Sequence, residues 1–124
     1  MLIKKYILVA FFLNICFGQN WVQNQRTEKL FKEAVSTYNS GRYATTETIL
    51  NKIIDLNYKS FNEKSLLLLL KSQVALNKSD VAKQTAKTFF SKYPSSPFLK
   101  HAMESIGDLF VNNSNYESAY KMYV

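Results

Sequence analysis

The sequence predicts an all-α protein built from antiparallel helix pairs. Three glycines and two prolines in 124 residues are too few for the many tight turns of a β-sandwich or barrel. Hydrophobic residues make up 47% of the chain, enough for most of it to fold. Polar turn segments containing Gly41, Asn77 and Ser114 recur at intervals of 36 and 37 residues. A repeat of this period between helical patterns indicates stacked helix–turn–helix units.

Residues 1–18 have the pattern of a secretory signal peptide that precedes the fold. Lys4 and Lys5 form a basic start, an apolar run follows, and Cys16 and Gly18 place small residues before a cleavage point. Cleavage after Gly18 would remove the only cysteine, so we expect no disulfide in the exported protein. Two alternatives stay open: an uncleaved membrane anchor, and lipoprotein processing at Cys16. Residues 19–26 are expected to form a leader segment.

The first two helices are predicted on either side of the turn at Gly41. One runs from about Arg26 to Tyr38, and the other runs from Tyr43 to Leu56. Apolar residues recur at helical spacing in both segments, which indicates one buried face on each. These residues are Leu30, Ala34, Val35, Ile49, Leu50, Ile53 and Ile54.

The second pair of helices is marked by capping signals. Ser60 and Glu63 match a capping box, in which each side chain accepts a hydrogen bond from the other residue's backbone amide. The helix that they open reaches about Leu76. Ser79 or Asp80 is expected to cap the following helix, which runs to Lys92.

The third pair begins at Ser96, a capping residue followed by proline. Pro97 suits the first helical position because its missing N–H is not needed there. Asn115 is expected to cap the last helix, which continues to the end of the sequence. The residues that we expect to face inward from the fifth helix are Leu99, Met103, Ile106 and Phe110.

With these positions in register, the sequence resembles the tetratricopeptide repeat family, whose period is about 34 residues. The third repeat matches best. Gly107 stands at the small position where the two helices of a repeat cross. The aromatic, small and aromatic positions of the second helix follow as Tyr116, Ala119 and Tyr123.

The first two repeats match this family less completely. They keep the small residues Ala34 and Ala82, but Thr46 and Leu70 stand where the family usually has alanine or glycine. The resemblance covers residues 27–124 and implies a short right-handed solenoid of about three repeats. Their ranges are 27–60, 61–96 and an incomplete 97–124.

A narrower resemblance lies around the start of the third repeat. The segment 92–97, followed by a helix with Ala102 and Gly107, is similar to exported bacterial tetratricopeptide repeat proteins. These include the Tol–Pal-associated cell-division coordinator and the outer-membrane assembly lipoprotein. The resemblance implies a periplasmic location, at or near the outer membrane, and binding of other envelope proteins or their peptide segments.

Five consecutive leucines, 66–70, predict a helix that is buried nearly all round. The family register turns Leu67 and Leu68 toward the concave groove of the solenoid. There they would form an apolar floor for a bound peptide, or they would pack against neighbouring helices instead.

The same register implies which residues line that groove. It would be apolar and basic at one end and acidic at the other, which suits an extended or helical segment of mixed charge. The expected lining is Phe31, Lys32, Val35, Tyr38, Asn39, Lys64, Leu67, Leu68, Lys71, Val74, His101, Glu104, Ser105, Asp108, Val111 and Asn112.

The sequence contains no recognisable catalytic motif. His101, Glu104 and Asp108 share one helix face, but a second histidine or a cysteine ligand is missing, so a solvated polar stripe is expected rather than a metal site. Phosphate-binding loops and the HExxH and GxSxG motifs are absent from the sequence. Ser95 and Ser96 are explained by helix capping. We therefore expect no enzyme and no cofactor.

The net charge of +7 does not indicate nucleic-acid binding. Lysines are spread over several helices, and Arg26 and Arg42 are the only arginines, so bidentate phosphate recognition is poorly supplied. A solvated basic surface with weak attraction to anionic headgroups is expected.

Taken together, these patterns predict an exported, non-catalytic scaffold or adaptor of the bacterial cell envelope that binds a partner segment in its groove. The alternative is a structural N-terminal portion of a longer repeat protein, or of an enzyme whose active domain lies beyond residue 124. An uncleaved signal or acylation at Cys16 would add membrane association.

Overall fold

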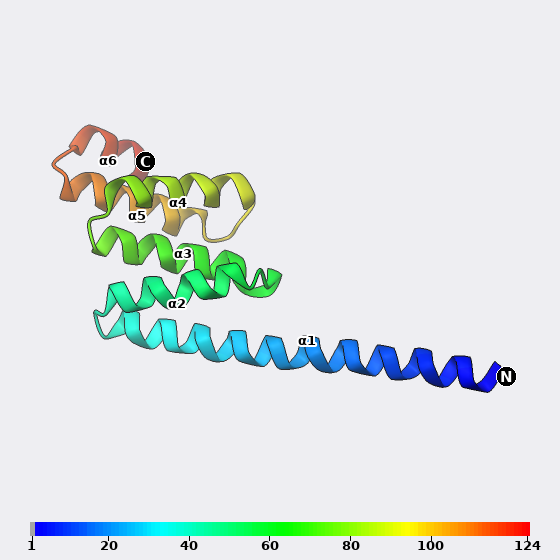
Figure 1. The fold of residues 1–124 in the computed structure, drawn as a ribbon. Helices are drawn as coiled ribbons and strands as arrows, with labels where there is room; N and C mark the ends of the chain where they lie inside the picture. The colour runs from blue at the N-terminus through cyan, green and yellow to red at the C-terminus, as the bar shows by residue number, and fades with distance from the viewer. Residues whose placement is uncertain (1) are drawn as a thin grey trace.

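The computed structural model describes the backbone of residues 2–124 and the side chains of residues 21–124. Every regular element in this part of the chain is an α-helix, which confirms the all-α prediction (Figure 1). The helices are α1 (Leu2–Asn39), α2 (Tyr43–Asp55), α3 (Lys59–Ala75), α4 (Ser79–Lys92), α5 (Leu99–Asn112) and α6 (Tyr116–Tyr123).

The helix bounds follow the sequence pattern closely except at the first helix. We predicted a start near Arg26, but α1 is already helical well upstream of that residue. The reason is that no glycine or proline interrupts residues 19–40, so nothing stops the helical hydrogen bonding there. The expected signal peptide, including Cys16, lies outside the residues whose side chains are described.

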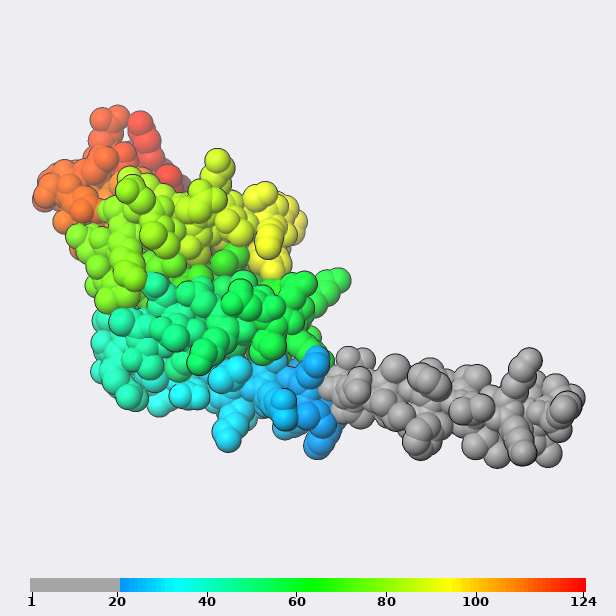
Figure 2. Space-filling model, viewed as in Figure 1, coloured from blue at the N-terminus to red at the C-terminus, as the bar shows by residue number. Residues whose placement is uncertain are grey.

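The six helices form three consecutive pairs that stack in chain order. The paired helices are α1 with α2, α3 with α4, and α5 with α6. Between pairs, α3 packs on both α1 and α2, and α5 packs on both α3 and α4. Figure 2 shows the result as successive layers, in which the colour changes steadily along the stack. This arrangement is a helical, repeat-like fold.

The turn inside each pair has the same backbone conformation. Gly41, Asn77 and Ser114 have φ angles of 74°, 55° and 59°, so each adopts the left-handed conformation that commonly ends a helix. The residue after each one donates its N–H to a carbonyl five residues back, at 2.9, 2.9 and 2.7 Å. These are Schellman motifs, and they make the three turns predicted from the sequence structurally equivalent.

Buried positions recur in the same register as the turns. Seven residues before each turn residue lie Ala34, Leu70 and Gly107, all buried. Five residues after each turn residue lie Thr46, Ala82 and Ala119, which are also all buried. The core therefore repeats with the turns, as expected of stacked pairs.

Thr46 shows how one departure from the small-residue pattern is accommodated. Its hydroxyl oxygen lies 2.8 Å from that of Thr37 on α1, and both side chains are buried. Each hydroxyl is also within hydrogen-bond distance of a carbonyl in its own helix, Thr37 of Ala34 and Thr46 of Arg42. A buried hydrogen bond between α1 and α2 thus takes the place of alanine packing.

Two of the predicted capping signals do not cap their helices. Ser60 is not an N-cap, because α3 begins at Lys59 and Ser60 already lies in its first turn. Glu63 instead accepts a hydrogen bond from the Ser96 hydroxyl, which links α3 to the loop before α5. Likewise α4 begins at Ser79 itself, so neither Ser79 nor Asp80 caps it.

Of the other two capping signals, the one at Asn115 works as predicted and the one at Ser96 does not. The Asn115 side chain accepts the N–H of Ser118 at the start of α6 and so satisfies an amide that the helix leaves free. The Ser96 hydroxyl accepts the N–H of Phe98 at 3.0 Å, but Phe98 is itself the N-cap residue and α5 begins at Leu99, so Pro97 does not take the first helical position.

The predicted inward face of α5 is correct except at one residue. Ile106 is buried, and Leu99 and Phe110 pack against the core as half-buried residues. Met103 is 44% exposed, so its assignment to the core was wrong.

The leucine run packs into the middle of the stack. Leu66, Leu69 and Leu70 are buried, whereas Leu67 and Leu68 are half-buried and pack against the core cluster. Because α3 has neighbours on both sides, it buries more of its circumference than an outer helix could.

Candidate partner-binding groove

A groove of about 420 Å³ opens where the first helices of the three pairs lie side by side. One wall is α5, the other is the C-terminal half of α3, and the end of α1 closes it. Its lining residues are Tyr38, Lys71, Val74, Ala75, His101, Glu104, Ser105, Asp108, Val111 and Asn112.

The repeat register explains why these side chains meet. Tyr38, Val74 and Val111 each lie three residues before a turn residue, so they occupy the same position in successive pairs. Lys71 and Asp108 are likewise equivalent and lie about one helical turn earlier. Equivalent positions on parallel first helices therefore form rows across the groove.

Its α5 wall carries most of the charge. The Glu104 carboxylate lies 3.6 Å from Nδ1 of His101 and 3.9 Å from Nζ of Lys100. Asp108 accepts a hydrogen bond from the Tyr123 hydroxyl, which ties this wall to α6. These pairs are solvent-exposed and contribute little to stability, so the carboxylates remain available to a ligand.

Lys71 faces this acidic wall from α3. Its side chain is half-buried, and among the described residues it has no ion pair. An ammonium without a carboxylate partner favours an acidic group on a bound molecule. The groove thus offers complementary charges on its two walls.

Tyr38 closes the groove at α1. Its ring contacts that of Tyr43 edge to face, with the centroids 5.3 Å apart. Burial raises the pKa of the Tyr38 hydroxyl, and the nearby Tyr43 raises it further. This residue therefore presents a neutral, hydrogen-bonding aromatic surface to a ligand.

The polar side chains of the groove include one serine and one histidine. The Ser105 hydroxyl donates to the carbonyl oxygen of His101 at 2.9 Å, so its proton is directed away from the groove. Among residues 21–124 no group of three or more His, Cys, Asp or Glu side chains could hold a metal ion. His101, Glu104 and Asp108 do line one surface, as their spacing predicts.

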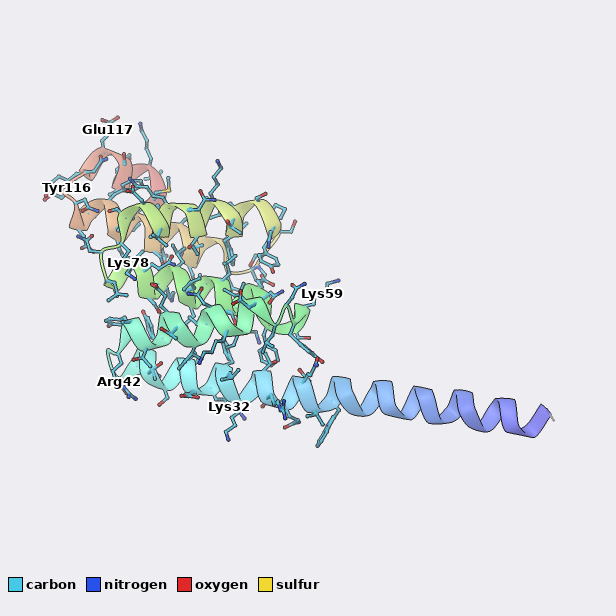
Figure 3. The ribbon with its side chains drawn as sticks, in the orientation of Figure 1. Lys32, Arg42, Lys59, Lys78, Tyr116 and Glu117 are labelled. Carbon is cyan, nitrogen blue, oxygen red and sulfur yellow. The ribbon has the colours of Figure 1, made fainter. Side chains whose placement is uncertain are left out.

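Seven residues of the predicted lining lie elsewhere. Phe31 stacks on Phe61 with centroids 5.9 Å apart, and Lys32 pairs with Glu28 at 2.9 Å and points away from the stack (Figure 3). Leu67 and Leu68 pack on the core. The remaining three are Val35, which is half-buried, and Asn39 and Lys64, which are exposed.

The groove also has one lining residue that we did not predict from the repeat register. Ala75 is equivalent to Asn39 and Asn112, two positions before each turn residue. Applying the same register to the second repeat would have identified it.

Comparisons of this chain with protein-family models, with curated proteins and with solved structures give no match. In the part of the chain that the structure describes, no helix combines the length and apolarity needed to cross a membrane.

Proposed function

We propose that this protein is an exported, non-catalytic adaptor of the tetratricopeptide repeat type, acting in a bacterial cell envelope. Its groove binds a peptide segment of another envelope protein. The observation that carries the proposal is the groove itself, because three successive repeats contribute equivalent residues to one continuous surface. Such a surface suits an extended or helical segment.

The residues along the groove support a ligand of mixed charge. Val74, Val111 and the Tyr38 ring offer apolar contact, whereas Lys71 faces the carboxylates of α5. Apolar anchors flanked by charges on both walls are typical of peptide recognition, in which the anchors supply affinity and the charges supply orientation.

Export is supported by the sequence of residues 1–18. The basic start, the apolar run and the small residues before Gln19 have the order of a cleavable secretory signal. A periplasmic location is the corresponding proposal, with envelope proteins as partners. Acylation at Cys16 would place the same groove at a membrane surface.

A pair of matched valine substitutions tests the groove. Val111 on α5 lines it and is 40% exposed, whereas Val81 on α4 lies outside it and is 50% exposed. The probe is a phage-displayed library of random peptides, selected on the immobilised full chain. We expect the selected peptides to bind the wild type and Val81→Glu but to lose about tenfold or more in affinity for Val111→Glu.

Circular dichroism and thermal melting of both variants provide the folding control. Because both valines are exposed, both variants should remain fully helical. Peptides that bind Val111→Glu as tightly as the wild type would place the binding site outside the groove. A selection that enriches no peptide would contradict the adaptor function.

A second candidate function is structural, as one portion of a longer solenoid. Leu50 and Ala86 are buried, but the equivalent Tyr123 is 48% exposed. Tyr116 and Glu117 on α6 also point into solvent at this end of the stack (Figure 3). A further helix packed on α6 would cover this face. Reading the coding DNA past codon 124 tests this, since an open frame with the same register supports it and a stop codon contradicts it.

A further inference from the structure

A second, smaller cleft lies between α4 and α5, away from the groove. Its apolar lining is Ala86, Phe90 and Ile106, and its volume is about 230 Å³. Ile106 is two residues from both Glu104 and Asp108, which puts the cleft on the opposite side of α5 from the groove.

The repeat register explains how the cleft arises. Ala86 is equivalent to Leu50 in the repeat register, and both side chains are buried. At the interface of α4 with α5 the leucine is replaced by alanine, and these two helices contact each other less extensively than α2 and α3 do. The shorter alanine side chain, itself almost fully buried, lies at the floor of the cleft.

Two lysines stand at the rim of this cleft. Lys83 and Lys87 are exposed, one helical turn apart on α4, and neither forms an ion pair among the described residues. The Lys83 ammonium lies 5.6 Å from the centre of the Phe110 ring on α5, so it reaches across toward the other wall. No acidic residue lines the cleft.

We propose that this cleft docks an acidic amphipathic helix of a partner protein. One bulky apolar side chain of that helix enters over Ala86, and carboxylates one turn to either side pair with Lys83 and Lys87. A cavity of about 150 Å³ already accommodates benzene, so 230 Å³ suffices for an aromatic side chain. The net charge stays basic after loss of Lys4 and Lys5 with the signal peptide, and it attracts an acidic partner over longer range.

The shape of the cleft favours a side chain over a lipid. Its short apolar floor of three residues matches one anchor, whereas a long acyl chain needs an extended channel. Apolar anchors flanked by charges are the usual features of helix-in-groove recognition.

The experiment uses a fluorescein-labelled helical peptide on an alanine–glutamine background. It carries one central phenylalanine and a glutamate one turn before and after it. Its binding to the full chain is followed by fluorescence anisotropy. We expect Ala86→Leu to fill the cleft and weaken binding about tenfold or more. Control peptides with phenylalanine replaced by alanine, or with both glutamates replaced by lysine, should bind at least as weakly.

A charge-swap variant keeps the test informative if Ala86→Leu disturbs the packing. The double substitution Lys83→Glu and Lys87→Glu changes only exposed side chains and should reverse the preference, so that the lysine peptide binds better than the glutamate peptide. Circular dichroism should show unchanged helicity for this variant.

Three outcomes would overturn the proposal. They are failure of the glutamate peptide to bind the wild type, unchanged binding to Ala86→Leu, and an unaltered preference after the charge swap. Decanoate binding that Ala86→Leu abolishes, without peptide binding, would reassign the cleft to an acyl chain. Because Val111→Glu leaves this cleft intact, the result is independent of the proposed function of the groove.

Discussion

Gly107 and Tyr123 form the contact that holds the last helix against α5. A Cβ atom at position 107 would lie 2.7 Å from the Tyr123 ring, so only glycine admits this ring at its present distance. The same tyrosine then donates its hydroxyl proton to Asp108 in the groove wall. Through Tyr123, the position of α6 is therefore linked to the Asp108 carboxylate, which lines the groove.

The hydrogen bond to Asp108 predicts an unusual titration. It raises the pKa of Tyr123 from 10.0 to about 12, with smaller contributions from burial and from the nearby carboxylates. Below pH 10 the phenol is protonated in both the folded and the unfolded chain, so its stabilising contribution is fully present. Between pH 10 and about 12 the unfolded chain releases the proton first, and the free energy of unfolding should fall as pH rises.

Ultraviolet absorbance of tyrosinate measures this titration directly. We expect Tyr123→Phe to remove the last-titrating component, and Gly107→Ala to shift it to lower pH because the added methyl group displaces the ring. The matched control is Tyr116→Phe, which removes an exposed tyrosine on the same helix. A late component that persists in Tyr123→Phe would contradict the assignment.

At the scale of single helices, the pairing of α1 with α2 depends on a buried polar contact. Thr37 and Thr46 have two hydroxyl protons for three hydrogen-bond contacts. One hydroxyl must therefore donate to the other, while the second donates to a carbonyl of its own helix. This contact joins two helices that are otherwise held by apolar packing.

A double-mutant cycle measures the strength of that contact. Thr37→Val and Thr46→Val should each lower the free energy of unfolding by about 1 kcal/mol, since valine keeps the shape but removes the hydrogen bond. The double variant should lose less than the sum of the two, by about 0.5–1 kcal/mol. Urea denaturation followed by circular dichroism provides the values.

Thr48→Val is the control for this cycle. The Thr48 hydroxyl donates to the carbonyl of Ala44 in the same way, but it is exposed and has no hydrogen bond to another helix among the described residues. Its replacement should change stability by no more than about 0.5 kcal/mol. Strict additivity of the two buried substitutions would show that the threonines do not interact.

Helix boundaries were predictable where the sequence determines local backbone conformation. Asn115 caps α6 because its side chain reaches the free amide of Ser118 without help from the rest of the fold. Ser96 instead bonds the N–H of Phe98 ahead of a helix that begins at Leu99. Ser60 did not follow its pattern. The chain turns at Asn57, which has a φ of 53°, and enters α3 at Lys59, so Ser60 has no free position ahead of the helix.

The groove was predictable only where the repeat register alone determines it. Lys71, Val74 and the α5 residues line it because equivalent positions face the same side. Phe31 and Leu67 do not line it, since their orientation depends on packing against neighbours such as Phe61. Such packing depends on the side-chain volumes of several helices together. The sequence of a single repeat does not contain this information.

For the molecule as a whole, the pattern of contacts predicts where the fold opens first. Helix α3 contacts α1, α2, α4 and α5, whereas α6 contacts α5 alone. Stability in stacked repeats is a sum of local terms and neighbour interfaces, so a helix with one neighbour is the least protected.

Hydrogen exchange followed by mass spectrometry tests this gradient. We expect amides of α3 to exchange most slowly among residues 21–124 and amides of α6 to exchange fastest. Gly107→Ala should accelerate α6 further and leave α3 unchanged, because it disturbs only the last interface. Uniform exchange across the helices would indicate a single cooperative unit instead.

The matching turns also have a genetic consequence. Gly41 and Asn77 end their helices with the same pair of hydrogen bonds, 36 residues apart. Recombination between their codons would delete or duplicate, in frame, a segment as long as one helix pair. The new junction would again be a complete turn. Each added or removed unit would meet neighbours at equivalent positions. Such a gene can change in length by copy number without first evolving a new connection.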